Sequence, residues 1–189
     1  AWRVRHASGD ADLLMVSVGR LVGWKGISVV VQALAQLPAS VHYLIVGDSP
    51  ERQPLQALAR QLGIDRRVHF AGSVAHAELP ILLSNCDIFV QPSKGEEAFG
   101  ISVVEAMACG LPVLASDNGG LPEIVLDDVT GRLLPPGDVS AWARTIAIGV
   151  AEPSTLRRWG AAARSRAESE FTWAANAEKL EMKLSGEIA

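Results

Sequence analysis

The stretch of this chain that decides its fold reads IFVQPSKGEEAFGISVVEAMACGLPVLA, residues 88–115. It opens with a short β-rich run, Ile88–Gln91, and passes through a loop that contains glycine and proline. A helical stretch, Ile101–Cys109, and a second β-rich run, Pro112–Ala115, follow. A strand, a helix and another strand at this spacing predict a βαβ unit of a parallel sheet.

The same alternation covers most of the chain. Further strands are expected at Leu13–Val18, Val41–Val46, Val68–Ala71 and Gly131–Leu134, and further helices at Ser28–Gln36, Glu51–Leu62, Ala77–Ser84, Pro122–Leu126 and Ser140–Ala151. We therefore expect an α/β fold with a doubly wound, Rossmann-like parallel sheet of six strands in the order 3-2-1-4-5-6.

After Pro153 the pattern changes to two helices, Thr155–Glu170 and Thr172–Ser185, with no strand between them. Ser154 or Thr155 is expected to cap the first helix, and Thr172 the second. We divide the chain into a lead-in (1–12), a Rossmann-like domain (13–153) and C-terminal helices (154–189) that pack on this domain or reach toward a missing one. The start lacks a methionine and is no signal peptide, which indicates a fragment of a longer protein.

Composition excludes several classes of protein. The chain has 189 residues, 49% of them hydrophobic and 20% charged, which suits one globular domain with a full core. The net charge is −4 and no basic stripe is present, so nucleic acid is not expected as a partner. No run approaches the ~20 apolar residues of a membrane span. Cys86 and Cys109 both lie among apolar residues, which favours a reducing, cytoplasmic location without a disulfide framework.

One carboxylate stands out within the helical stretch. Glu105 is the only charged residue between Ala98 and Ser116. A carboxylate in an apolar run is costly to bury unless something binds it. The segment therefore predicts that Glu105 meets a ligand or, alternatively, a distant Arg or Lys in a buried ion pair.

Ligands of open α/β sheets bind at the carboxyl ends of the strands, where the strand order reverses. In the expected order, that point brings the loops 19–26 and 92–100 face to face. The first loop carries Arg20 and Lys25 among glycines, and both cations suit phosphate oxygens. The alternative is a surface loop with two solvated cations. The spacing fits neither a Walker loop nor the dinucleotide fingerprint, which argues against ATP hydrolysis and NAD chemistry.

The second loop leads into the helix that carries Glu105. Gly100 permits a close backbone approach, and the free N–H groups of the first helical turn can hold an anion. Glu105, about one turn further, is placed to accept hydrogen bonds from ligand hydroxyls, while Glu97 addresses another part of the same ligand. Together these features predict a polyhydroxylated molecule that carries a diphosphate, which is a nucleotide-sugar.

Other motifs are less decisive. Gly119–Gly120 forms either a plain strand–helix turn or a ligand contact near the same crevice, and Pro122 is expected at the first helical position. Asp10-Ala11-Asp12 resembles a metal motif of other sugar transferases, but it precedes the first strand and is expected to be solvated. The histidines show no metal-ligand spacing, although His76, after the third strand, is placed to touch a base. No metal site is expected.

Several motifs in order then suggest a family. They are Gly19-Arg20-Leu21 with Lys25-Gly26, Val46-Gly47-Asp48, Phe70-Ala71-Gly72, Glu97 with Phe99-Gly100 and the run from Glu105 to Val113, and Gly119-Gly120-Leu121-Pro122-Glu123. From about Leu13 to Ser185 the chain resembles the retaining GT-B glycosyltransferases of family GT4, the glycosyl transferases group 1. Each piece alone is weak, whereas the ordered set is specific.

The resemblance implies an organisation and an activity. Such enzymes place two Rossmann-like domains across a cleft, and this chain resembles the C-terminal, donor-binding domain. The implied reaction transfers a hexose from a nucleoside-diphosphate sugar, with UDP, GDP or ADP as the nucleotide, to an acceptor hydroxyl with retention of configuration. No metal or other cofactor is implied. The N-terminal acceptor domain of the parent chain would be the partner, and any peripheral membrane attachment would come through that parent.

The resemblance also implies roles for individual residues. Arg20 and Lys25 match the cations that stabilise the leaving diphosphate, Glu97 the glutamate that contacts the donor sugar, and Glu105 the carboxylate that binds the ribose hydroxyls. The remaining donor-binding positions are Gly19, then Ser73 and Val74 near the base, and Phe99, Gly100 and Ile101 at backbone positions around the sugar and phosphates.

Two rival functions stay open. A nucleotide-sugar epimerase or a sugar phosphorylase shares the two-domain plan, and an epimerase would release a sugar without any acceptor. A non-catalytic nucleotide-sugar-binding module is the other rival. The complete motif set argues against the module.

Overall fold

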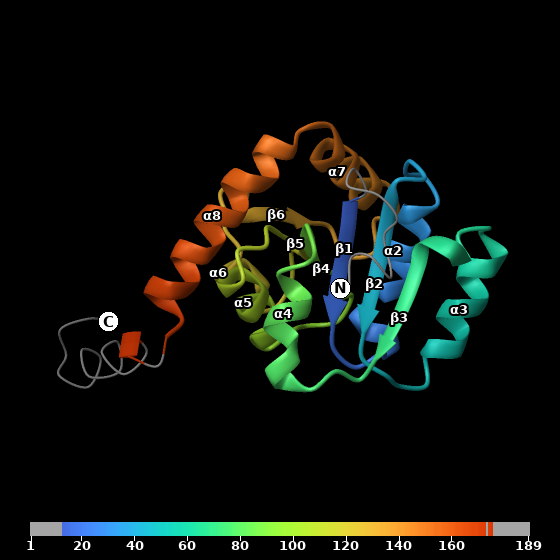
Figure 1. The fold of residues 1–189 in the computed structure, drawn as a ribbon, viewed down its shortest axis with the longest axis horizontal. Helices are drawn as coiled ribbons and strands as arrows, with labels where there is room; N and C mark the ends of the chain where they lie inside the picture. Colours follow the sequence, from blue (N-terminus) through green and yellow to red (C-terminus); the bar gives the residue numbers. More distant parts are fainter. Residues whose placement is uncertain (1–12, 173, 176–189) are drawn as a thin grey trace.

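The computed structural model describes residues 13–172, 174 and 175. Its centre is a sheet of six parallel strands in the order β3-β2-β1-β4-β5-β6, as predicted (Figure 1). The strands are β1 (Leu13–Val18), β2 (Val41–Val46), β3 (Val68–Gly72), β4 (Ile88–Gln91), β5 (Val113–Ser116) and β6 (Gly131–Leu134).

Helices connect these strands. They are α2 (Ile27–Leu34), α3 (Arg52–Gln61), α4 (Leu79–Leu83), α5 (Ile101–Ala108), α6 (Leu121–Ile124), α7 (Val139–Ala151) and α8 (Pro153–Glu170), with single 3-10 turns η1 (Gly23–Lys25), η2 (Asp65–Arg67) and η3 (His76–Glu78). The crossover from β3 returns across the sheet to β4, which lies beside β1, so the direction of winding reverses there and the helices cover both faces of the sheet.

Both faces of the sheet are covered, which explains the nearly continuous apolar runs of the strands. On one face, Met15 of β1 packs in a cluster with α2, α3 and α7. On the other face, Leu14 and Val16 pack in a cluster with α4, α5 and α6. The first half of α8 joins the first cluster through Trp159, and its second half joins the other through Ala163. The predicted doubly wound α/β architecture is therefore confirmed.

Helix ends differ from the sequence prediction where proline takes part. Helix α8 begins at Pro153, before both residues expected to cap it, because the fixed φ of proline suits the first helical turn. Its N-cap, Glu152, makes no capping hydrogen bond with its side chain. Pro122 follows Leu121, which is the first residue of α6, and that helix ends early because Val125 is extended.

Some predictions fall partly or wholly outside the described residues. Asp10–Asp12 lies outside them, as does most of the second C-terminal helix. At the start of that helix, Thr172 Oγ1 accepts a hydrogen bond from the Ala175 N–H at 3.1 Å, in agreement with the predicted cap. Within the described part of the chain, no helix has both the length and the apolar character to cross a membrane.

The loops after β1 and β4 press against each other at the carboxyl edge of the sheet. Gly26 has a φ of 68°, and a Cβ there would lie 1.9 Å from the carbonyl oxygen of Pro92. Two N–H groups of the β4 loop, those of Lys94 and Gly95, donate to the carbonyl oxygen of Trp24 at 2.7 and 3.1 Å. The predicted facing of loops 19–26 and 92–100 is thus confirmed, and only glycine fits at the point of closest approach.

Replacing Gly26 should therefore lower the free energy of unfolding by more than its left-handed backbone conformation alone would explain. Gly63 has nearly the same φ, 69°, but nothing lies within 4 Å of its Cβ position, so Gly63→Ala is a matched control. We expect Gly63→Ala to lower the free energy of unfolding by about 1 kcal/mol and Gly26→Ala by about 3 kcal/mol, because the β4 loop must also move. Urea unfolding of both variants measures the difference, and equal losses would contradict the close approach.

Candidate functional site

A cavity of about 380 Å³ opens at the carboxyl ends of β1, β2 and β3, beside α5. This volume lies within the range of small-molecule sites. Its lining includes Gly19, Arg20, Ser73, Val74 and Glu105, which the sequence had placed at one site. The rest of the lining comes from Val18, Val46, Gly47, Asp48, His76 and Leu79.

Glu105 lies at the border of this cavity. Its side chain is 28% exposed, so it is less buried than the apolar run around it had suggested. The reason is that Val103, Ala106 and Met107 take the core-facing side of α5 and leave Glu105 on the flank. The expected alternative, an ion pair with Arg or Lys, is not seen among the described residues. Instead, Glu105 Oε1 lies 3.5 Å from Nδ1 of the exposed His76.

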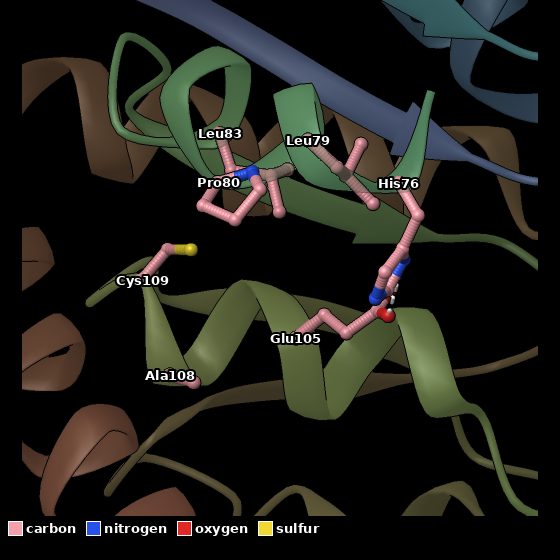
Figure 2. A pocket seen from close by; sticks show the side chains of 7 residues that line it. All are labelled: His76, Leu79, Pro80, Leu83, Glu105, Ala108 and Cys109. Atoms are coloured by element: carbon pink, nitrogen blue, oxygen red, sulfur yellow. Dashed lines mark ion pairs between the residues drawn. The ribbon is translucent and has the colours of Figure 1, made fainter. Parts of the chain in front are cut away.

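Glu105 and His76 also border a second hollow, of about 340 Å³, between α4 and α5 (Figure 2). Its other lining residues are Leu79, Pro80, Leu83, Ala108 and Cys109. Burial raises the pKa of the Cys109 thiol, the negative charge of Glu105 raises it further, and Arg164 acts in the opposite direction. Glu105 therefore lines both hollows and acts electrostatically on the thiol in the second.

The most direct contact between the two facing loops is an ion pair that sequence reasoning missed. Lys25 Nζ donates to both carboxylate oxygens of Glu97, at 2.9 Å to Oε1 and 2.8 Å to Oε2. The two side chains are only 16% and 12% exposed. The sequence assigned Lys25 to phosphate and Glu97 to sugar separately, whereas the structure pairs them because their loops meet.

Two further polar residues hold Glu97. Gln91 Nε2 and Ser93 Oγ both donate to Glu97 Oε2, each at 3.0 Å. Gln91 is 3% exposed and Ser93 is fully buried. Neither was singled out from the sequence, although polar residues directly after the apolar run Ile88–Val90 were a usable signal for the carboxyl edge of the sheet.

The turn after β5 holds the backbone of the same loop. The N–H of Gly120 donates to the Glu97 carbonyl at 2.7 Å, and a Cβ on Gly119 would lie 2.5 Å from that oxygen. Asn118 Nδ2 donates to the carbonyls of Ser93 and Gly95, at 3.0 and 3.2 Å. Of the two expectations for Gly119–Gly120, the structure shows the strand–helix turn. The backbone of this turn holds the Glu97 loop in place.

Residues 99–101 carry the loop into α5 and do not line the large cavity. Gly100 has a φ of 95° and is the N-cap of α5, where no side chain caps the helix, and its carbonyl oxygen accepts the Val103 N–H at 2.9 Å. Phe99 and Ile101 are exposed. Phe99 meets the Phe171 ring edge-on, with 6.0 Å between centroids. On the facing loop, Lys25 Nζ lies over the Trp24 ring, 4.8 Å from the ring centroid.

The chemistry of this arrangement is that of an anion and hydroxyl binder. Arg20 and the start of α5 favour negative charge, while the carboxylates of Glu97 and Glu105 accept hydrogen bonds from hydroxyls. In residues 13–172, 174 and 175, no cluster of three or more His, Cys, Asp or Glu side chains could hold a metal ion.

Comparison with known proteins gives this geometry a context. Residues 1–166 match the family model described as "Glycosyl transferases group 1". The chain is 34% identical to a GDP-mannose-dependent alpha-(1-6)-phosphatidylinositol monomannoside mannosyltransferase of Mycolicibacterium smegmatis, over 97% of this chain and 50% of that protein. It is 37% identical to a D-inositol 3-phosphate glycosyltransferase of Xylanimonas cellulosilytica, over 87% of this chain and 40% of that protein. The chain thus spans about half the length of these relatives or less.

Solved structures share the fold. The Anabaena protein HepE in complex with UDP-glucose superposes with a TM-score of 0.85 and 31% identity, over 93% of this chain and 49% of that chain. The catalytic domain of cholesterol-alpha-glucosyltransferase from Helicobacter pylori has a TM-score of 0.76 at 22% identity, and 99% of that chain is covered. The Helicobacter pylori structure shows that this fold occurs in a crystallised chain of similar length.

The Lys25–Glu97 pair should show strong energetic coupling. Removing one partner leaves a partly buried charge without compensation, so we expect a double-mutant cycle of Lys25→Met and Glu97→Gln to give a coupling of about 2 kcal/mol in urea unfolding. Arg164 and Glu168, equally close at 2.8 Å but exposed, serve as the control pair. Their coupling is expected to be only about 0.4 kcal/mol. Equal couplings would show that burial adds nothing to the loop contact.

The thiol of Cys109 should report the charge of Glu105. Because its pKa is raised, less thiolate is present at pH 8 than in a free cysteine, and alkylation by iodoacetamide should be correspondingly slow. Glu105→Gln should lower that pKa and speed the reaction, whereas Glu123→Gln should leave the rate unchanged. Mass spectrometry of the Cys109 peptide over a range of pH gives the alkylation rates. An unchanged rate in Glu105→Gln would show that the charge of Glu105 does not act on the Cys109 thiol.

Proposed function

Because the chain belongs to the family of glycosyl transferases group 1, we propose that it is the donor-binding half of a retaining glycosyltransferase. The parent enzyme would transfer a hexose from a nucleoside-diphosphate sugar to an acceptor hydroxyl. The observation that carries this proposal is the shared cavity, in which Arg20 and Glu105 stand among the carboxyl ends of three parallel strands.

The cavity suits a nucleoside diphosphate. Glu105 has free acceptor capacity toward the cavity and would bind the ribose hydroxyls, with Ser73 and Val74 beside the base. Arg20, which lines the same cavity, would bind the diphosphate, with Gly19 permitting its close approach. HepE carries bound UDP-glucose on the same fold at 31% identity, which supports a nucleotide-sugar as the ligand class.

The neighbouring ion pair suits the reacting end of the donor. Glu97 would orient the sugar, and Lys25 would stabilise the departing phosphate together with Arg20. Charge develops on that phosphate as the bond to the sugar breaks, so preorganised cations there lower the barrier. Gly100 and Ile101 would add backbone N–H groups, and Phe99 would border the sugar. The acceptor hydroxyl would then attack from the same face of the sugar, without a protein nucleophile and without a metal.

The acceptor would be held by the N-terminal half of the parent chain, in keeping with relatives about twice as long. The donor half alone should bind donor and turn over poorly, because the acceptor site and closure of the cleft are absent. We place the enzyme in the cytoplasm, with any membrane contact made through the parent protein.

Donor binding is tested by calorimetric titration of this chain with UDP, GDP and ADP and with UDP-glucose, GDP-mannose and ADP-glucose. We expect one nucleotide to bind saturably. Affinity should fall about tenfold or more in Arg20→Ala and in Glu105→Gln, since each loses a hydrogen bond to a charged group. Arg157→Ala, an exposed arginine on α8, is the matched control and should bind like the wild type. Failure of the folded chain and of the full-length parent to bind any of them would reject the proposal.

A further inference from the structure

The two carboxylate oxygens of Glu97 are not equivalent. Oε2 accepts hydrogen bonds from Lys25, Gln91 and Ser93, at 2.8, 3.0 and 3.0 Å. Oε1 accepts only the bond from Lys25, at 2.9 Å, among the described residues. Since each carboxylate oxygen offers about two acceptor sites, Oε2 is saturated and Oε1 retains capacity for one more donor.

The donors on Oε2 are themselves fixed. Gln91 Nε2 donates to Ser93 Oγ at 3.0 Å as well as to Glu97 Oε2 at 3.0 Å. The Ser93 hydroxyl accepts that bond and points its own hydrogen at Glu97. Both residues are almost fully buried at the end of β4, a central strand, which leaves them little freedom to turn.

We propose that Gln91 and Ser93 are positioning residues that clamp Glu97 by Oε2 and present Oε1 to a hydroxyl of the donor sugar. This inference rests on the proposed function, because it assigns the clamp to the sugar end of the donor. Neither residue touches the donor itself; both act through Glu97.

Lys25 extends the clamp toward the leaving phosphate. An ammonium group has three N–H donors, and two of them bind Glu97. Lys25 and Gln91 line one small hollow with Gly19 and Arg20, next to the large cavity. One unit therefore joins the proposed sugar contact to the proposed phosphate contact.

The clamp is tested by separating sugar binding from nucleotide binding. Gln91→Met keeps the length of the side chain and removes its donors, and Ser93→Ala removes the hydroxyl. Thr130→Val, a buried hydroxyl at the far edge of the sheet that accepts from the Leu126 N–H, is the control for loss of a buried hydrogen bond. Each variant is titrated with UDP-glucose, GDP-mannose and ADP-glucose, and with UDP, GDP and ADP alone. Thermal unfolding confirms that each variant is folded.

We expect the nucleoside diphosphate to bind both clamp variants within about twofold of wild type, while the matching nucleotide-sugar binds about tenfold more weakly. The control variant Thr130→Val should change neither the affinity for the nucleoside diphosphate nor that for the nucleotide-sugar. If the nucleotide-sugar and the nucleotide lose affinity alike, or neither does, Gln91 and Ser93 are only structural and the inference is overturned while the proposed function stands. If neither the wild-type chain nor the full-length parent binds any of the six probes, the proposed function falls, and this inference falls with it.

Discussion

The contact between the loops after β1 and β4 is the constraint on which the rest of the site depends. It occurs at the reversal of the strand order, where no crossover helix fills the space between two neighbouring parallel strands. Gly26 allows the two backbones to touch, and the Lys25–Glu97 ion pair joins the side chains above them. Without this contact, the cation and the carboxylate would belong to two independent surface loops.

This contact also decides the electrostatic character of the site. A partly buried lysine and glutamate each carry a desolvation cost, which their mutual hydrogen bonds and the donors from Gln91 and Ser93 offset. The turn at Gly119–Gly120 and the amide of Asn118 seat the backbone of the same loop from the β5 side. Glu97 is thus held from three neighbouring strands and arrives at its position with little freedom left to lose.

Glu105 has different surroundings from those of Glu97. It lies on the flank of α5, half-buried, with the exposed His76 as its nearest ionisable neighbour. It keeps acceptor capacity open to the large cavity and raises the pKa of the Cys109 thiol in the adjoining hollow. One carboxylate is therefore held in a network of hydrogen bonds, while the other borders two hollows.

The sequence by itself determined the fold class, the strand order and the edge of the sheet where the site lies. Apolar periodicity and turn residues are local signals, and parallel crossovers leave few topologies open. It also marked Arg20, Lys25, Glu97 and Glu105 as the residues of interest. Only the tertiary structure decided that Lys25 binds Glu97, that Gln91, Ser93 and Asn118 support them, and that Glu105 is partly exposed on the flank of α5. These facts depend on the close approach of loops far apart in the chain and on which side of a helix faces the core, and no local pattern of residues encodes either.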